Sequence, residues 1–294
     1  MVLEPLQTPE LDNWLSSQST AMADDVYRLA EINSGTRNLS GVDRVAESAS
    51  RSLIAMGASV ERVALPSVES IDDHGRACEF RPADAVVARA RPDATTRVLL
   101  SIHLDTVFDE SHPFQRLSRP SADRLQGPGV LDAKGGLVVM LYALRAFERL
   151  PVARRIGWTA LLNTDEEIGS PASSALLVAE AGRHEIGLVF EPALPDGAWV
   201  GARRGSGNFT LVMRGRSAHA GRDFDHGRNA LLALIRALDK IARLTDTARG
   251  VTVNVARVAG GGPSNVIPDL AVGRFNVRLT EPSDVPPIRA SLDR

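Results

Sequence analysis

The sequence predicts an α/β protein: a mostly parallel β-sheet sandwiched by helices, followed by a smaller α+β domain of the ferredoxin-like type. Apolar runs typical of strands alternate with helix-like segments up to Glu191, as in parallel sheets covered on both faces. After Pro192 the order becomes strand, helix, strand, strand, which matches the start of a split βαβ unit. We expect a hinge within residues 199–207 and a domain boundary near residue 202.

The elements of the first part follow from hydrophobic periodicity. In chain order, we expect helices at 8–33 and 41–56, a strand at 58–65, a polar loop at 66–83, strands at 85–90 and 98–107, a helix at 137–150, and strands at 156–164 and 188–190. In such sheets, ligands collect at the carboxyl ends of the strands.

The second part has the pattern of a small domain that is only partly present. We expect a strand at 208–214, an amphipathic helix at 229–244, and strands at 251–259 and 266–279. Residues 286–293 resemble a helix just beginning, with Pro in its first turn. We therefore expect this domain to be truncated.

Composition excludes several functional classes. The 294 residues carry a net charge of −2, without the basic field that nucleic-acid binding needs. No apolar run is long enough to cross a bilayer, and residues 1–6 do not resemble a signal peptide, so we expect a cytoplasmic protein that binds neither nucleic acid nor membrane. The single cysteine, Cys78, excludes an internal disulfide and fits an incidental thiol.

The first motif that carries chemistry is His103-Leu104-Asp105, at the end of the expected strand 98–107. Side chains at positions i and i+2 of a strand share a face. Asp105 can therefore accept the second N–H of the His103 imidazole and orient it as a metal ligand. The alternative is a strand-end pair that merely faces solvent.

The second motif is the glycine-rich segment 127–136, which places Asp132 at the entrance of the expected helix 137–150. Its four glycines permit backbone with positive φ and close approach to a neighbouring group. The segment lacks the patterns of phosphate-binding loops, which disfavours nucleotide binding.

Two further strand ends carry carboxylates: Glu166 and Glu167 after strand 156–164, and Glu191 after strand 188–190. The run from Asp165 to Glu167 also fits a solvated acidic turn that precedes a helix. One imidazole and several carboxylates from separate strand ends are, however, typical of an open site for one or two Zn²⁺-like ions. The pattern favours a metallohydrolase.

Five motifs in this order resemble the M20 metallopeptidases, and in particular their glutamate carboxypeptidase-like branch. They lie at residues 102–107, 127–136, 164–170, 191–192 and 217–221, and the resemblance extends from about residue 25 to 279. It implies a zinc-peptidase-like catalytic, metal-binding domain at 1–202. Residues 203–294 would form an inserted lid and dimerisation domain.

The resemblance also implies a ligand set. His103, Asp132 and Glu191 would bind one zinc, while Asp132 would bridge to a second zinc bound by Glu167. The family's last ligand, a His from a segment after the smaller domain, has no counterpart among the remaining histidines, which fit surface positions. We therefore expect a C-terminally incomplete chain and an incomplete second zinc site.

Catalytic roles follow from the same resemblance. Glu166 corresponds to the general base that takes a proton from the metal-bound water, and Asp105 to the residue that supports the His ligand. A cis peptide bond is implied after Asp132.

Three residues of the second domain correspond to substrate-facing positions. His219 resembles the family His that reaches a scissile carbonyl, often in the partner subunit. Asn265 and Arg278 resemble the pair that holds the substrate carboxylate, a task that suits a guanidinium because its planar donors match a carboxylate.

Together these inferences predict a zinc-dependent hydrolase that cleaves an amide or peptide bond next to an amino acid with a free carboxylate. An N-acyl-amino-acid deacylase or desuccinylase is the alternative within the class. From another class, we keep an inactive metal-binding or dimerisation fragment. The expected partners are a small peptide or N-acyl amino acid and, through the lid, a second copy of the chain.

Overall fold

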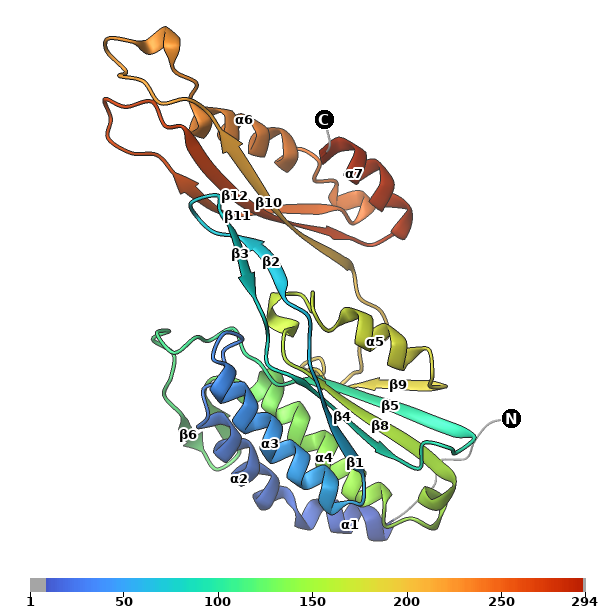
Figure 1. The fold of residues 1–294 in the computed structure, drawn as a ribbon. Helices are drawn as coiled ribbons and strands as arrows, with labels where there is room; N and C mark the ends of the chain where they lie inside the picture. The colour runs from blue at the N-terminus through green and yellow to red at the C-terminus, as the bar shows by residue number, and fades with distance from the viewer. Residues whose placement is uncertain (1–8, 293–294) are drawn as a thin grey trace. The chain divides into compact units, whose positions relative to one another are not determined.

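The computed structural model describes residues 9–292, which form two compact units (Figure 1). The first unit contains the described residues up to Val68 together with Arg81–Ala193. The second contains Glu69–Phe80 and the residues from Leu194 onward. Residues 69–80, which the sequence assigned to the first domain, thus belong to the second unit.

The first unit is built on a five-stranded sheet with the order β1-β4-β8-β5-β9. Its strands are β1 (Ser59–Val63), β4 (Ala85–Ala90), β5 (Thr96–His103), β8 (Ile156–Asn163) and β9 (Ile186–Val189). β5 pairs in parallel with β8 and β9, whereas β4 pairs antiparallel with β8 and β1. The predicted α/β class is confirmed, and the carboxyl ends of the three parallel strands meet at one edge.

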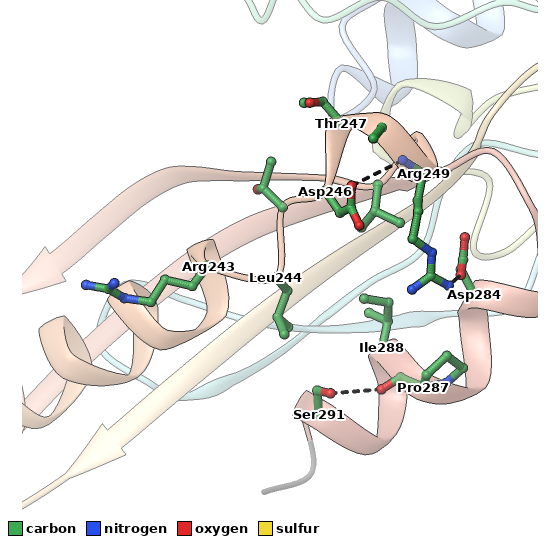
Figure 2. A pocket seen from close by; sticks show the side chains of 12 residues that line it. Arg243, Leu244, Asp246, Thr247, Arg249, Asp284, Pro287, Ile288 and Ser291 are labelled. Atoms are coloured by element: carbon green, nitrogen blue, oxygen red, sulfur yellow. Dashed lines mark hydrogen bonds and ion pairs between the residues drawn. The ribbon is translucent and has the colours of Figure 1, made fainter.

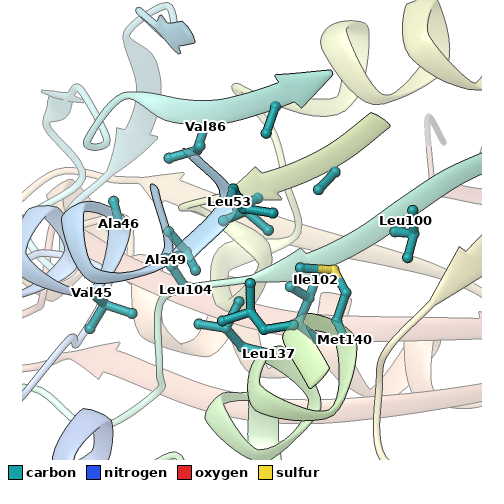
Figure 3. Close-up of a cluster of buried hydrophobic side chains, with 14 of the residues drawn as sticks. Val45, Ala46, Ala49, Leu53, Val86, Leu100, Ile102, Leu104, Leu137 and Met140 are labelled. Carbon is teal, nitrogen blue, oxygen red and sulfur yellow. The ribbon is translucent and has the colours of Figure 1, made fainter. Parts of the chain in front are cut away.

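Helices cover both faces of this sheet (Figure 1). They are α1 (Pro9–Ser17), α2 (Ser19–Ala30), α3 (Leu39–Ala55), α4 (Gly136–Phe147) and α5 (Ser174–Ala181). Because strand side chains alternate between faces, Leu100 and Ile102 of β5 pack in the α3/α4 layer, while Leu99 packs on the α5 side. The main core lies between the sheet and α3 and α4, where Leu53, Leu137 and Met140 are fully buried (Figure 3). Each such side chain contributes roughly 1.5–3 kcal/mol.

The start of α4 lies unusually close to the end of β9. A Cβ atom on Gly136 would lie 1.9 Å from the carbonyl oxygen of Phe190, so only glycine permits this approach. The contact places the segment that carries Asp132 beside the segment that carries Glu191. This glycine therefore positions two of the predicted ligands.

The second unit contains a three-stranded antiparallel sheet in the order β10-β12-β11. Its elements are β10 (Gly205–Arg214), α6 (Ala230–Ala242), β11 (Thr252–Gly260), β12 (Leu270–Leu279) and α7 (Val285–Leu292). Leu234 and Leu238 of α6 pack on Phe275 and Val277 of β12. The strand-helix-strand-strand order is the predicted one, but the last strand begins at Leu270 rather than at residue 266.

The expected loop at 66–83 is wrong in part, because it contains a hairpin of β2 (Val68–Ile71) and β3 (Ala77–Phe80). Asp73 in its turn forms ion pairs with Arg257 and Arg274, and Nη2 of Arg214 donates to the carbonyl of Gly75 at 2.6 Å. These long-range contacts, which local polarity does not reveal, hold the hairpin in the second unit. A second short hairpin joins β6 (Ser118–Ser121) and β7 (Arg124–Gln126).

Candidate metal centre

His103, the last residue of β5, is buried with only 2% of its surface exposed. Its Nδ1 lies 3.0 Å from the carbonyl oxygen of Asp105 and 3.4 Å from Oδ1 of the Asp105 carboxylate. Its Nε2 lies 2.9 Å from Oδ1 of Asp132 and 3.6 Å from Oε1 of Glu191. One ring nitrogen therefore faces the strand backbone and Asp105, and the other faces two carboxylates.

Asp132 and Glu191 reach His103 from two different loops. Asp132 follows Gly129, whose φ of 70° requires glycine, and its own φ of −119° and ψ of 99° depart from helical values. The peptide bond between Asp132 and Ala133 is cis, as the resemblance predicted. Ligand atoms of His103, Asp132 and Glu191 all lie within 4.8 Å of one another. The structure thus brings together the three residues predicted to bind the first zinc.

The charges around His103 favour a bound cation. Burial disfavours the protonated ring, but the carboxylates of Asp105 and Asp132, with a smaller effect of Glu191, raise the pKa of His103 to about 11. An imidazole nitrogen facing two carboxylates is also a donor set typical of catalytic zinc. The residues present therefore fit a Zn²⁺-like ion.

Asp105 connects the centre to two other segments. Its carboxylate, 1% exposed, accepts hydrogen bonds from the backbone N–H groups of Glu166 and Glu167, each at 3.2 Å. It also accepts one from the hydroxyl of Thr36 at 2.7 Å. Sequence reasoning identified Asp105 but not Thr36, because a threonine in a polar loop carries no distinctive pattern.

The three consecutive acids after β8 have different environments. Asp165 is fully buried, and its Oδ2 accepts the N–H groups of Ala172 and Ser173 at 2.7 and 3.1 Å, so it is not part of a solvated turn. Glu166 is exposed, whereas Oε1 of Glu167 accepts the N–H of Val107 at 3.1 Å.

Glu167 lies within the field of the other carboxylates but outside the three-residue cluster that contains His103. Burial, followed by the charges of Asp132, Asp105 and Glu166, raises the pKa of Glu167 to about 7, although His103 opposes this. A cation nearby would favour its ionised form.

Lys134, two residues after Asp132 in the sequence, is a buried lysine that sequence reasoning missed. Only 2% of its surface is exposed, and its Nζ donates to the carbonyl of Ile32 at 2.5 Å. Burial lowers the pKa of Lys134 to about 8. A single lysine in a glycine-rich segment gave no signal of this burial.

The predicted substrate-facing residues lie in the second unit and separate into two places. His219 forms a β-bridge with Val266, and the N–H of Ala220 donates to the carbonyl of Asn265 at 2.9 Å, so the His219 and Asn265 segments are adjacent. Arg278 lies eight residues beyond Leu270 along β12, roughly 26 Å at about 3.3 Å per residue. Asn265 and Arg278 of one chain are therefore too far apart to hold the same carboxylate.

Arg278 is nevertheless held in a defined way. Its Nε donates to Oδ1 of Asn276 at 3.0 Å, and Nδ2 of Asn276 donates to Oδ1 of Asn208 at 2.7 Å. The guanidinium is thereby anchored at one edge, on an exposed face of the sheet. This arrangement suits recognition of an anionic group.

The second unit also contains a cavity of about 570 Å³ between the end of α6 and α7 (Figure 2). Arg249 and Asp284 form an ion pair in its wall, and Ile288 and Ser291 line it from α7. None of the nine predicted site residues lines this cavity. The cavity is therefore separate from the candidate metal centre.

Comparison with known proteins supports the family predicted from the motifs. Residues 201–294 match the peptidase dimerisation domain of the M20 family. The chain is 26% identical over 270 residues to carboxypeptidase G2 from Pseudomonas sp. (strain RS-16), covering 92% of this chain and 62% of the relative. It is 30% identical over 236 residues to N-acetyl-L-citrulline deacetylase from Xanthomonas campestris pv. campestris, covering 76% of this chain and 60% of the relative.

A solved structure shows the same fold. Human carnosine dipeptidase 1 superposes with a TM-score of 0.70 at 15% identity, covering 97% of this chain and 75% of that protein. The chain spans about three fifths of the length of the two curated relatives. Among residues 9–292, no helix is long and apolar enough to cross a membrane. The matched dimerisation domain, the sequence relatives and the shared fold agree with the resemblance of the chain to the M20 metallopeptidases.

Proposed function

We propose that the chain carries the metal centre and the lid of a zinc-dependent hydrolase. The enzyme would cleave an amide or peptide bond next to an amino acid with a free carboxylate. The observation that carries this proposal is the placement of Nε2 of His103 against the carboxylates of Asp132 and Glu191. These three groups would hold the ion.

The residues around the ion divide the remaining tasks. A zinc ion bound there would lower the pKa of a water molecule and polarise the amide carbonyl. Glu166 would take a proton from that water and return it to the leaving amine, since its side chain is exposed while its backbone N–H is anchored to Asp105. Asp105 would fix the position of the His103 ring relative to the turn that carries Glu166.

Asp132 and Glu167 would provide ligands for a second ion. Burial and neighbouring carboxylates destabilise the ionised form of Glu167. A bound cation would stabilise that form, so Glu167 suits the role of a metal ligand. Within the described residues, this second group offers fewer donors than the three around His103. We therefore expect the first site to bind zinc more tightly.

The lid residues support a homodimer with composite substrate sites. Residues 201–294 match a peptidase dimerisation domain, and Arg278 lies at the opposite end of β12 from Asn265 and His219. If Asn265 and Arg278 contact one substrate, they come from different copies of the chain. His219 would then stabilise the developing oxyanion at the partner's centre, and Arg278 would bind the substrate carboxylate.

A deacylase is the second candidate, because one relative is an N-acetyl-L-citrulline deacetylase. The same metal centre would serve either reaction, since both break an amide bond beside an α-carboxylate. The choice between them depends on the leaving and acyl groups that the lid accepts. A metal-binding but inactive module remains the alternative of another class.

The test is metal analysis of purified residues 1–294 combined with a substrate panel. Zinc content would be measured for the wild type and for His103→Ala, and turnover for dipeptides, peptides ending in glutamate, and N-acetyl amino acids including N-acetylcitrulline. We expect zinc in the wild type but not in His103→Ala, whereas Glu166→Gln should retain the metal and lose turnover. Equal zinc content in wild type and His103→Ala would refute the proposed centre. Zinc without turnover of any substrate would favour the inactive module.

A further inference from the structure

The shortest hydrogen bond to the Asp105 carboxylate comes from a residue far away in sequence. Oγ1 of Thr36 donates to Oδ2 of Asp105 at 2.7 Å, across 69 positions. The two backbone N–H groups that donate to the same carboxylate lie at 3.2 Å. Thr36 is itself 7% exposed, so this bond to an ionised acceptor is shielded from solvent.

The backbone fixes where the Thr36 hydroxyl points. Residues 34–36 run parallel to Thr106, which donates its N–H to Ser34 at 2.9 Å and accepts the N–H of Thr36 at 3.2 Å. At Gly35, between Ser34 and Thr36, an added Cβ atom would lie 2.6 Å from the carbonyl oxygen of Phe108. Only a glycine therefore lets the two backbone segments come this close. These backbone contacts therefore hold the Thr36 hydroxyl beside the segment that carries His103 and Asp105.

We infer that Thr36 is a positioning residue of the metal centre. Its hydroxyl holds one oxygen of Asp105, while the other faces Nδ1 of His103 and accepts the N–H of Glu166. Without this donor the carboxylate loses its shortest partner and can rotate. Both the ring of His103 and the turn that carries Glu166 and Glu167 would loosen. The inference rests on the proposed function, because it assumes that the His103 group binds a metal.

Thr106 provides a matched control. Its hydroxyl is as buried as the Asp105 carboxylate and lies one residue away, but it has no hydrogen-bond partner among the described residues. Thr106→Val removes a buried hydroxyl next to the centre without removing a bond to Asp105. If the loss of any buried hydroxyl near the centre weakens zinc binding, both variants should bind zinc more weakly. If Thr36 positions Asp105, only Thr36→Val should do so.

The experiment compares wild type, Thr36→Val, Thr36→Ser and Thr106→Val of the full chain. Zinc affinity is measured by competition with a chromophoric chelator, coordination by the absorption spectrum of the Co²⁺-loaded protein, and stability by urea unfolding. Thr36→Val should weaken zinc binding about tenfold, at the lower end of effects seen for residues that support metal ligands, and shift the cobalt bands. Thr36→Ser keeps the hydroxyl and should restore both, and Thr106→Val should match the wild type.

The outcomes separate this inference from the function on which it rests. A wild type that binds no zinc would overturn the metal centre. A wild type that binds zinc tightly, with Thr36→Val within twofold of it, would overturn only the role of Thr36. Equal losses in Thr36→Val and Thr36→Ser, or in Thr106→Val, would also overturn that role. If Thr36→Val does not fold, Thr36→Ala is measured with the same expected loss.

Discussion

Replacing Lys134 with Met tests whether the fold disfavours a positive charge at this buried position, two residues after Asp132 in the sequence. Lys134 is buried, and its Nζ has one hydrogen bond, to the carbonyl of Ile32. Burial lowers its pKa from 10.5 to about 8. That difference corresponds to roughly 3.4 kcal/mol between the charged and neutral forms.

The sign of the pH dependence follows from proton binding. Between about pH 8 and 10.5 the unfolded chain holds the Lys134 proton and the folded chain does not. Stability rises with pH wherever the unfolded state binds more protons. The wild type should therefore gain stability as the pH rises through this window, whereas Lys134→Met should lack this gain. From pH 7 to pH 10 the free energy of unfolding of the wild type should increase by roughly 2.5 kcal/mol relative to the variant.

Urea unfolding at pH 7 and pH 10 measures this difference. A chelator keeps metal from the neighbouring carboxylates, and the fluorescence of buried Trp158 reports on the first unit, since Trp199 is exposed. Lys240→Met, at an exposed position on α6, is the control and should follow the wild type. If wild type and Lys134→Met change in parallel within about 0.5 kcal/mol, which is the size of an ordinary surface effect, the burial argument is refuted.

Three further predictions concern the ligands and their supports. Asp132→Ala should abolish bound zinc, as measured by elemental analysis, because Asp132 faces the metal-binding nitrogen of His103; retained zinc would contradict its role. Glu167→Gln should reduce the number of bound ions or their affinity, whereas Glu166→Gln should reduce only turnover, and the reverse result would exchange their roles. Gly136→Ala should destabilise the first unit by about 1–3 kcal/mol and weaken zinc binding, because its Cβ would meet a backbone carbonyl at 1.9 Å. Gly187→Ala, which meets nothing within 4 Å, is its control, and equal effects would refute the packing argument.

The parts of the site that local sequence pattern could predict are those that lie at strand ends. The alternation of strand 98–107 placed His103 and Asp105 on one face, and the structure finds Nδ1 of His103 beside Asp105. The glycines around Asp132 predicted an unusual backbone, which the φ of Gly129 confirms. Family resemblance then grouped His103 with Asp132 and Glu191, and these three lie together.

The parts that sequence could not predict depend on contacts between distant segments. Thr36 meets Asp105 across 69 positions, and Asp73 meets Arg274 across 201 positions. A threonine or an aspartate in a polar loop has no periodic pattern that distinguishes a tertiary bond from exposure to water. For the same reason, the hairpin of β2 and β3 was expected to be a loop, and the distance from Asn265 to Arg278 was not foreseen.

The arrangement around Asp105 links the metal centre to the stability of the first unit. A buried carboxylate is tolerated only when hydrogen bonds replace its hydration, and Asp105 obtains them from Thr36, Glu166 and Glu167. These donors come from two segments, the loop before α3 and the turn after β8, which meet at the segment after β5 that carries Asp105. Folding the first unit therefore orients His103 and the Glu166 turn before any ion is bound. Because these side chains already hold their positions, little of the free energy of metal binding would be spent on rearranging the protein. More of that free energy would then contribute to affinity and to electrostatic stabilisation of a reacting group.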